Sequence, residues 1–355
     1  MTNPLTPPTP PTPATPVARP TRLTARSPED LLAAAAVVLG FWPTESVVML
    51  TFDATHPFHA RVDLPTDLGA MGELAAALAA PAVHHRVGRV VLLLYSADPD
   101  RVQAAWRALR DRLRRHRITV TEALAVGDDH WRSLLGGRAD RGDARDGVPF
   151  DPVRLAAHPF LAQAVVDGRV LHRSRADLAA SLEPDAEAVA RVERAVDRLA
   201  TRAGALDAPS AQLAEGTWAQ ALVARHLASV APVPTVPHDD DAARLLCSMR
   251  ELRVRDAAWS AITRARARPA VALFGDLLRR SPRELVPAAA ALLAWAAWQA
   301  GDGALAWCAL DRCDDVDPAY GLSALIAEAL ERAVPPSAMA EGFDWREGLE
   351  GLETG

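Results

Sequence analysis

The chain has 355 residues, half of them hydrophobic, and a formal net charge of −6. This length is enough for about two domains with buried cores. All 39 basic residues are arginine, and the absence of lysine excludes the lysine-dependent chemistry of P-loop and Schiff-base enzymes. The mildly negative charge argues against a dedicated nucleic-acid-binding protein, so we expect no nucleic-acid partner.

The N-terminal 26 residues alternate proline and threonine with little to bury, which predicts a disordered arm over residues 1–26. This Pro/Thr-rich N-terminus does not resemble a signal peptide, because it has no apolar core segment, and three cysteines are spread widely through the second half. Both features favour a reducing, cytoplasmic location. The most apolar stretch, residues 285–300, is too short to span a bilayer, so we expect no membrane partner.

Residues 27–65 predict a helix followed by a β-hairpin. Ser27 precedes Pro28 and stands three positions before Asp30, which is the spacing of a capping box. Gly40 follows the last apolar position and predicts a left-handed helix end. The runs 46–52 and 59–64 have strand composition, and the short loop between them suits an antiparallel pair.

The motif LGFWPTESVVML at residues 39–50, followed by ARVDLP at residues 60–65, resembles the start of an actinobacterial family known as domain of unknown function 4192 (DUF4192). Weaker likeness continues at residues 131–133, 147–149 and 174–178 and in a tryptophan-rich C-terminal stretch. The resemblance covers most of the chain. It implies no activity and no catalytic residues.

The next segments alternate helices and strands. We predict a helix over 67–80, a buried strand over 89–95, a helix from Asp98 to residue 115 with an apolar face and a solvated arginine face, and a strand over 118–126. Strands separated by helices imply right-handed crossovers. The prediction is therefore an α/β N-terminal domain with a mostly parallel sheet, in which the first hairpin strand is antiparallel. Residues 127–150 are predicted to be a loop.

From residue 151 onward the apolar spacing is helical almost throughout. The segments predicted as helices are 153–168, 175–182, 184–203, 211–230, 240–268, 270–280, 282–300, 303–314 and 319–333. The turn at 231–237 separates an α/β domain with following helices, 27–230, from an all-α domain, 238–334, and residues 335–355 are predicted to be a flexible tail.

The C-terminal helices carry small and terminating residues at the spacing of a tetratricopeptide-like helical hairpin, namely Gly301, Ala306, Leu310, Cys313 and Pro318. The all-α domain is therefore predicted to be partly tetratricopeptide-like. Its tryptophans are expected to pack in the core, with a peptide-binding groove as the alternative.

One edge of the predicted sheet gathers polar side chains. In a parallel sheet, ligands bind beyond the carboxyl ends of the strands. The residues expected at that edge are Asp63, Asp98, Asp128, His130 and Trp131, with Trp131 as a possible lid. The alternative is that Asp98 only caps a helix and Asp128 only makes a turn. No zinc-spaced cysteines, phosphate loop or nucleophile motif is present, so no cofactor or metal is predicted.

Two functions remain open from the sequence. The first is a non-enzymatic interaction protein that binds a protein partner through its C-terminal helices. The alternative is a small-molecule or metal-binding enzyme of unknown reaction that uses the acidic edge of the sheet.

Overall fold

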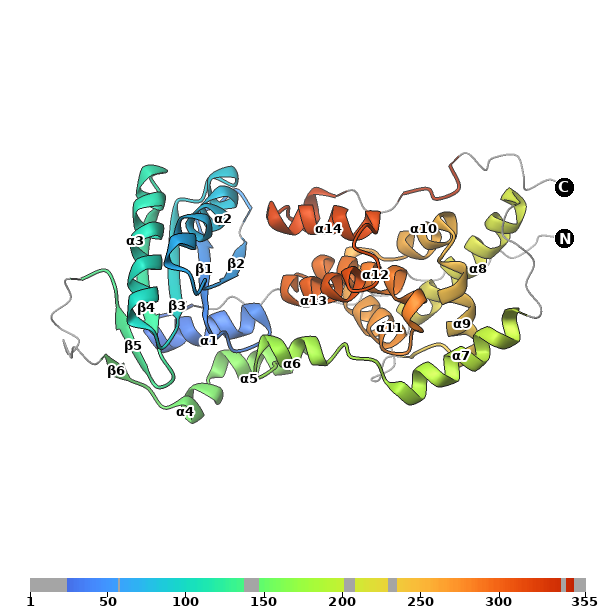
Figure 1. Cartoon of the computed structure of the whole chain (residues 1–355), viewed down its shortest axis with the longest axis horizontal. Coiled ribbons are helices and arrows are strands. Elements are labelled where there is room, and N and C mark those ends of the chain that lie inside the picture. The colour runs from blue at the N-terminus through green and yellow to red at the C-terminus, as the bar shows by residue number, and fades with distance from the viewer. Residues whose placement is uncertain are drawn as a thin grey trace, which may run out of the picture.

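The computed structural model describes residues 24–56, 58–136, 147–200, 208–228, 235–339 and 343–347. Most of the predicted disordered arm, and part of the predicted tail, lie outside these ranges. Figure 1 shows an α/β half and a helical half side by side along the longest axis of the molecule. No helix in the described part of the chain is both long enough and apolar enough to cross a membrane.

The α/β half is built on one sheet with strand order β2-β1-β3-β4-β5-β6. The strands are β1 (Ser46–Phe52), β2 (His59–Asp63), β3 (Arg89–Tyr95), β4 (Thr119–Val126), β5 (His130–Ser133) and β6 (Val148–Pro149). Of the five pairings among the described residues, only β3 with β4 is parallel. The prediction of a mostly parallel sheet is therefore wrong, although an α/β half followed by helices is what the structure shows.

The reason lies in where the first strand is placed. β1 lies between β2 and β3 and pairs antiparallel with both. The crossover through α2 (Met71–His84) therefore joins two strands that run the same way but are not neighbours. The predicted loop after β4 instead turns back as β5 and pairs antiparallel with β4. Strand direction was predicted for β1 to β4, but strand order was not, because order depends on pairing between distant segments.

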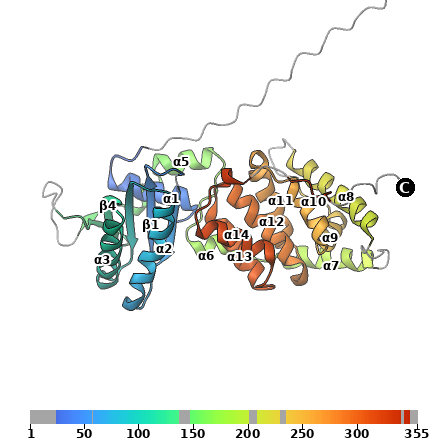
Figure 2. The ribbon, with the colours of Figure 1, turned by 90° about the horizontal axis from the view of Figure 1, so that it is seen from above.

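Two helical layers cover the sheet. Val47 and Met49 of β1 face a core shared with α2 and α3 (Pro99–Arg115). Val48 and Leu50 face the opposite way, into a core shared with α1 (Pro28–Leu39) and with the helical half. Figure 2 shows the sheet between α1 on one side and α2 and α3 on the other. Since alternate residues of a strand point to opposite faces, the buried run SVVML supplies both cores.

Local signals for the helices of this half are confirmed. The Ser27 hydroxyl accepts a hydrogen bond from the Asp30 N–H, and the Asp30 carboxylate accepts one from the Ser27 N–H. Gly40 ends α1 in the left-handed region with φ of 75°. The predicted apolar face of α3 is buried, and its members are Val102, Ala105, Trp106, Leu109 and Leu113.

The remaining helices form the connection and the helical half. They are α4 (Pro152–Ala156), α5 (Pro159–Val166), α6 (Arg175–Ala180), α7 (Ala186–Ala200), α8 (Pro209–Leu227), α9 (Asp239–Ser248), α10 (Leu252–Ser260), α11 (Ala267–Arg279), α12 (Val286–Gln299), α13 (Gly303–Asp314) and α14 (Gly321–Glu331), with short 3-10 turns η1 (Leu68–Ala70), η2 (Arg264–Arg266), η3 (Arg283–Leu285) and η4 (Pro336–Ala338). Two long predicted helices are split. Pro159 begins α5 and separates it from α4, and the chain turns between α9 and α10.

Helices from both sides of the predicted boundary at 231–237 pack together. α7 contacts α9, and α8 contacts α10 and α11. α12 is buried along nearly its whole length, and it pairs with α13. Gly301 makes the turn between them with φ of 79°, and Ala306 has no exposed surface, as the hairpin spacing requires.

Contacts between the two halves are partly polar. Arg175 on α6 forms an ion pair with Asp311 on α13, with Nη2 to Oδ2 at 2.8 Å. His85 at the end of α2 donates from Nε2 to the carbonyl of Arg332, at 2.9 Å. The buried residues of α1, of the sheet face beneath it and of the helical half form one continuous core. The two halves therefore pack against each other directly.

Candidate functional site

The predicted polar edge of the sheet exists, but its residues are spread along it. β2, β3 and β4 run the same way, so Asp63, Asp98 and Asp128 follow strand ends at one edge. Strands lie about 4.8 Å apart, which puts the end of β2 about 10 Å from the end of β3 and about 14 Å from the end of β4. In the described part of the chain, no hydrogen bond or ion pair joins these three carboxylates.

Asp63, Asp98 and His130 each have a local partner. Asp63 pairs with Arg61 on its own strand at 2.6 Å. Asp98 caps α3 by accepting hydrogen bonds from the N–H groups of Asp100 and Arg101. His130 interacts through Nδ1 with the carboxylate of Asp129, and Asp128 is exposed. Asp98 therefore acts as a helix cap, which was the alternative to a ligand-binding role.

Trp131 lies on β5 and is 7% exposed. Its Nε1 donates to the carboxylate of Glu29 on α1, at 3.0 Å. The indole is thus part of the core under α1, which is not the position of a lid over the edge.

The edge is held by Glu45, to which the sequence assigned no role, and by Arg101. Arg101 was predicted to lie on the solvated arginine face of its helix, but its side chain is only 15% exposed. Glu45 accepts hydrogen bonds from the Ser96 hydroxyl at 3.0 Å and from Nη1 of Arg101 at 2.6 Å. Arg101 also donates to the carbonyls of Pro65 and Leu64, at 3.0 and 2.5 Å. This network ties the start of β1, the end of β2 and the first turn of α3 together. Within the described ranges, no group of three or more His, Cys, Asp or Glu side chains is placed to hold a metal ion.

A different region has the geometry of a binding site. Residues 343–347, here called the tail segment, lie along α8 and α10 of the helical half. Trp345 is 2% exposed and sits in a socket formed by Leu213, Gly216 and Ala257. A Cβ added to Gly216 would lie 2.5 Å from Cζ3 of the indole, so only glycine allows the ring to approach this closely.

Side chains of the helices also hold the main chain of the tail segment. Nη1 of Arg253 on α10 donates to the carbonyls of Trp345 and Glu347, at 3.3 and 2.7 Å. Phe343 packs edge-on against Trp259, with ring centroids 4.9 Å apart. Aromatic anchors and hydrogen bonds to main-chain carbonyls are two features by which proteins bind extended peptides.

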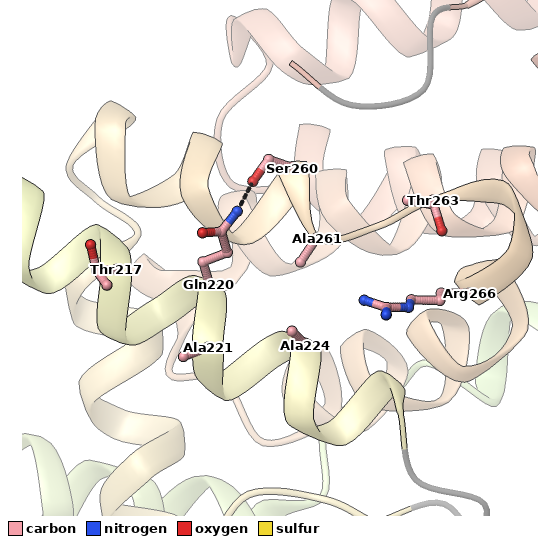
Figure 3. Close-up of a pocket in the computed structure, with 8 residues that line it drawn as sticks. All are labelled: Thr217, Gln220, Ala221, Ala224, Ser260, Ala261, Thr263 and Arg266. Carbon is pink, nitrogen blue, oxygen red and sulfur yellow. Dashed lines mark hydrogen bonds between the residues drawn. The ribbon is translucent and has the colours of Figure 1, made fainter. Parts of the chain in front are cut away.

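A pocket of about 330 Å³ adjoins this groove between α8 and α10. Its lining is Thr217, Gln220, Ala221, Ala224, Ser260, Ala261, Thr263 and Arg266. Figure 3 shows the guanidinium of Arg266 directed toward the space between Ala224 and Ala261. Gln220 donates to the hydroxyl of Ser260 at 2.9 Å, and its carbonyl oxygen accepts from Arg346 of the tail segment at 3.4 Å. The pocket and the groove therefore share Gln220.

The charge that lines the pocket is positive. Arg266 is the charged residue among its lining residues, none of which is acidic. Across the described residues, no hydrogen bond or ion pair engages the Arg266 guanidinium. Alanine methyls and threonine hydroxyls around a guanidinium suit a small group that is apolar on one side and anionic on the other.

Comparison with known proteins gives one match. A family model described as "Domain of unknown function (DUF4192)" matches residues 28–337. The chain belongs to this family. No curated protein and no solved structure matches the chain.

In this DUF4192 chain, sequence reasoning missed the groove because its parts are far apart in sequence. One signal was present: Gly216 interrupts the apolar pattern of a predicted helix, and an isolated helical glycine often marks a close approach. A second was Trp345, the one aromatic side chain besides Phe343 in the predicted tail. Only the folded structure shows that the two belong together.

Proposed function

We propose that the protein is a non-enzymatic interaction protein whose helical half binds an extended segment of a partner protein in the groove between α8 and α10. The observation that carries the proposal is the tail segment itself. It occupies the groove as a bound peptide would, with a buried tryptophan and main-chain hydrogen bonds.

The other features of the groove support this function. The Gly216 socket accepts one large aromatic ring, which is the kind of anchor that contributes most to peptide affinity. Arg253 contacts carbonyl oxygens, which every peptide offers, so it adds affinity without selecting a sequence. By contrast, most of the charged groups at the sheet edge form ion pairs or cap a helix, and they do not converge on one site, so the interaction function is the better supported one.

We also propose a cytoplasmic protein with a protein partner. The three cysteines are free, and two of them are buried, which fits a reducing compartment. The net charge of −6 fits a protein partner better than a nucleic acid.

The test uses the full chain with Trp345→Ala, which empties the socket and leaves its walls intact. A fluorescent peptide with the sequence GFDWREGL, residues 342–349, is added and its anisotropy is measured. We expect saturable binding that is lost when alanine replaces the tryptophan of the peptide. Wild-type chain should bind about sixfold more weakly, because its own segment occupies the socket in most molecules and must be displaced.

The matched control carries Gly216→Ala in addition to Trp345→Ala. The added methyl group fills the socket, so the peptide should bind at least tenfold more weakly while the circular dichroism spectrum is unchanged. If the Trp345→Ala chain is folded and does not bind the peptide, or if the double variant binds it equally well, the proposed function is wrong.

A further inference from the structure

We infer that the partner segment carries an acidic residue directly after its anchoring tryptophan, and that its carboxylate binds Arg266 in the pocket between α8 and α10. This inference rests on the proposed function and names the chemistry of the partner. It concerns the pocket, which the tail segment does not fill.

The direction of the tail segment shows which residue of a partner would reach the pocket. Trp345 lies beside Gly216, and Arg346 reaches Gln220, one helical turn further along α8. Gln220 belongs to the pocket wall. The residue after the tryptophan is therefore the one placed at the mouth of the pocket.

The chain's own residue at that place is mismatched in charge. Arg346 brings a guanidinium to a pocket whose charged lining residue, Arg266, is also a guanidinium. The pocket wall has no carboxylate to separate the two. The Arg346 guanidinium instead stacks on the ring of Trp345, 4.6 Å from its centroid. Two like charges at one pocket weaken binding, and a carboxylate at this place would instead form an attractive pair with Arg266.

The size and walls of the pocket fit such a group. A volume of about 330 Å³ is at the lower end for ligand pockets and is enough for a glutamate side chain with room to adjust. The alanine methyls of the wall would contact its methylenes, and the guanidinium of Arg266, directed toward the space between Ala224 and Ala261, would donate to its carboxylate (Figure 3). The tail segment is thus a weak internal ligand that a better-matched partner displaces.

The test compares three peptides on the Trp345→Ala chain: GFDWREGL and the same sequence with glutamine or glutamate in place of the arginine. We expect affinity to rise in the order arginine, glutamine, glutamate, with about a threefold to tenfold gain from arginine to glutamate at low salt. The gain should shrink in 1 M salt, because screening weakens a partly exposed pair. The same three peptides are also measured on the wild-type chain, where we expect the same order of affinities at lower apparent affinity. This measurement tests the inference even if the Trp345→Ala chain misfolds.

Arg266→Ala supplies the matched control, since it removes the cation and leaves the socket and Arg253 in place. The three peptides should then bind within about twofold of one another. Equal affinities on the parent chain, or a glutamate advantage that persists without Arg266, would overturn the inference and leave the proposed function standing. Failure of all three peptides would instead count against the proposed function. Free glutarate is a separate arm: if it binds in an Arg266-dependent way as tightly as the glutamate peptide, the pocket serves a small molecule and the inference is wrong.

Discussion

Replacing Gly216 with alanine should release the tail segment without unfolding α8. The added Cβ would lie 2.5 and 2.6 Å from two ring atoms of Trp345, closer than real side chains approach one another. The indole must therefore move out of its socket. The helix itself gains, because alanine is favoured over glycine in a helix interior by up to about 1 kcal/mol.

The magnitude follows from the contacts of the tail segment. Burying an indole completely stabilises by about 5–6 kcal/mol at ~25 cal/mol per Å². The two hydrogen bonds from Arg253 and the contact between Phe343 and Trp259 add about 1 kcal/mol each. Ordering the five residues 343–347 costs about 1.5 kcal/mol each, so the docked form is favoured by only about 1 kcal/mol. If half of the indole surface becomes exposed, the free energy lost is larger than this margin of about 1 kcal/mol, so the undocked form becomes the favoured one.

Trypsin gives a direct readout, because the bond after Arg346 is a cleavage site inside the tail segment. A margin of about 1 kcal/mol leaves roughly one molecule in six undocked in the wild type. Since cleavage follows the open population, Gly216→Ala should release residues 347–355 up to about sixfold faster. Mass spectrometry of the product identifies the site, and thermal melting reports the rest of the fold.

Gly275→Ala is the matched control. Gly275 lies inside α11 and has no atom within 4 Å of an added Cβ, so only the helix propensity changes. It should be cleaved after Arg346 at the wild-type rate and melt at the same or a slightly higher temperature. Cleavage of Gly216→Ala at the wild-type rate would refute the socket and the reasoning built on it.

Three further outcomes follow from the described contacts. Arg101→Ala leaves the carbonyls of Leu64 and Pro65 without this donor, so it should lower the free energy of unfolding, measured in urea, by about 1–3 kcal/mol. The control Arg110→Ala removes an exposed side chain and should change that free energy by less than about 0.5 kcal/mol. Equal effects of the two substitutions would contradict the role of Arg101. Burial raises the pKa of Asp302, although the N–H of Leu305 and the charges of Arg169 and His172 act in the opposite direction. The folded state therefore holds the proton of this carboxyl group more tightly than the unfolded state, and stability is lost as the pH rises through the folded pKa. Asp302→Asn keeps the helix cap and should therefore be at least as stable as wild type at pH 7, with an advantage that shrinks toward pH 4; a clear loss at pH 7 would show that the charge itself is needed. Burial raises the pKa of Cys308 to about 11 and that of Cys313 to about 12, so iodoacetamide at pH 8 should label Cys247 first in the native protein, and rapid labelling of either buried thiol would contradict their placement.

Much of the local structure could be predicted because its causes are local. The cap of α1, its end at Gly40 and the buried face of α3 each depend on residues within a few positions of one another. The bounds of α13 were predicted for the same reason, since a glycine turn and an apolar repeat define it. The split of α4 from α5 was missed although Pro159 was visible, because the apolar spacing continues across the break.

The candidate site could not be predicted in the same way. Strand directions placed Asp63 and Asp98 at one edge, yet the insertion of β1 between their strands keeps them apart. Glu45 and Arg101 read as ordinary surface residues until β1, β2 and α3 meet. The tail segment has too little apolar content to predict any structure, and its docking depends on a glycine more than a hundred positions earlier.

The sequence by itself determined the strands β1 to β4 and most of the helices, which of their faces are apolar, and that lysine chemistry is absent. These properties follow from residue type and from spacing within one turn or one strand. Only the tertiary structure decided the order of the strands, the use of Arg101 at the sheet edge, and the seat of Trp345 beside Gly216. These three features depend on which apolar surfaces pack against each other. Because the free energy of apolar burial is non-directional, the apolar pattern of one segment does not specify which other segment it packs against.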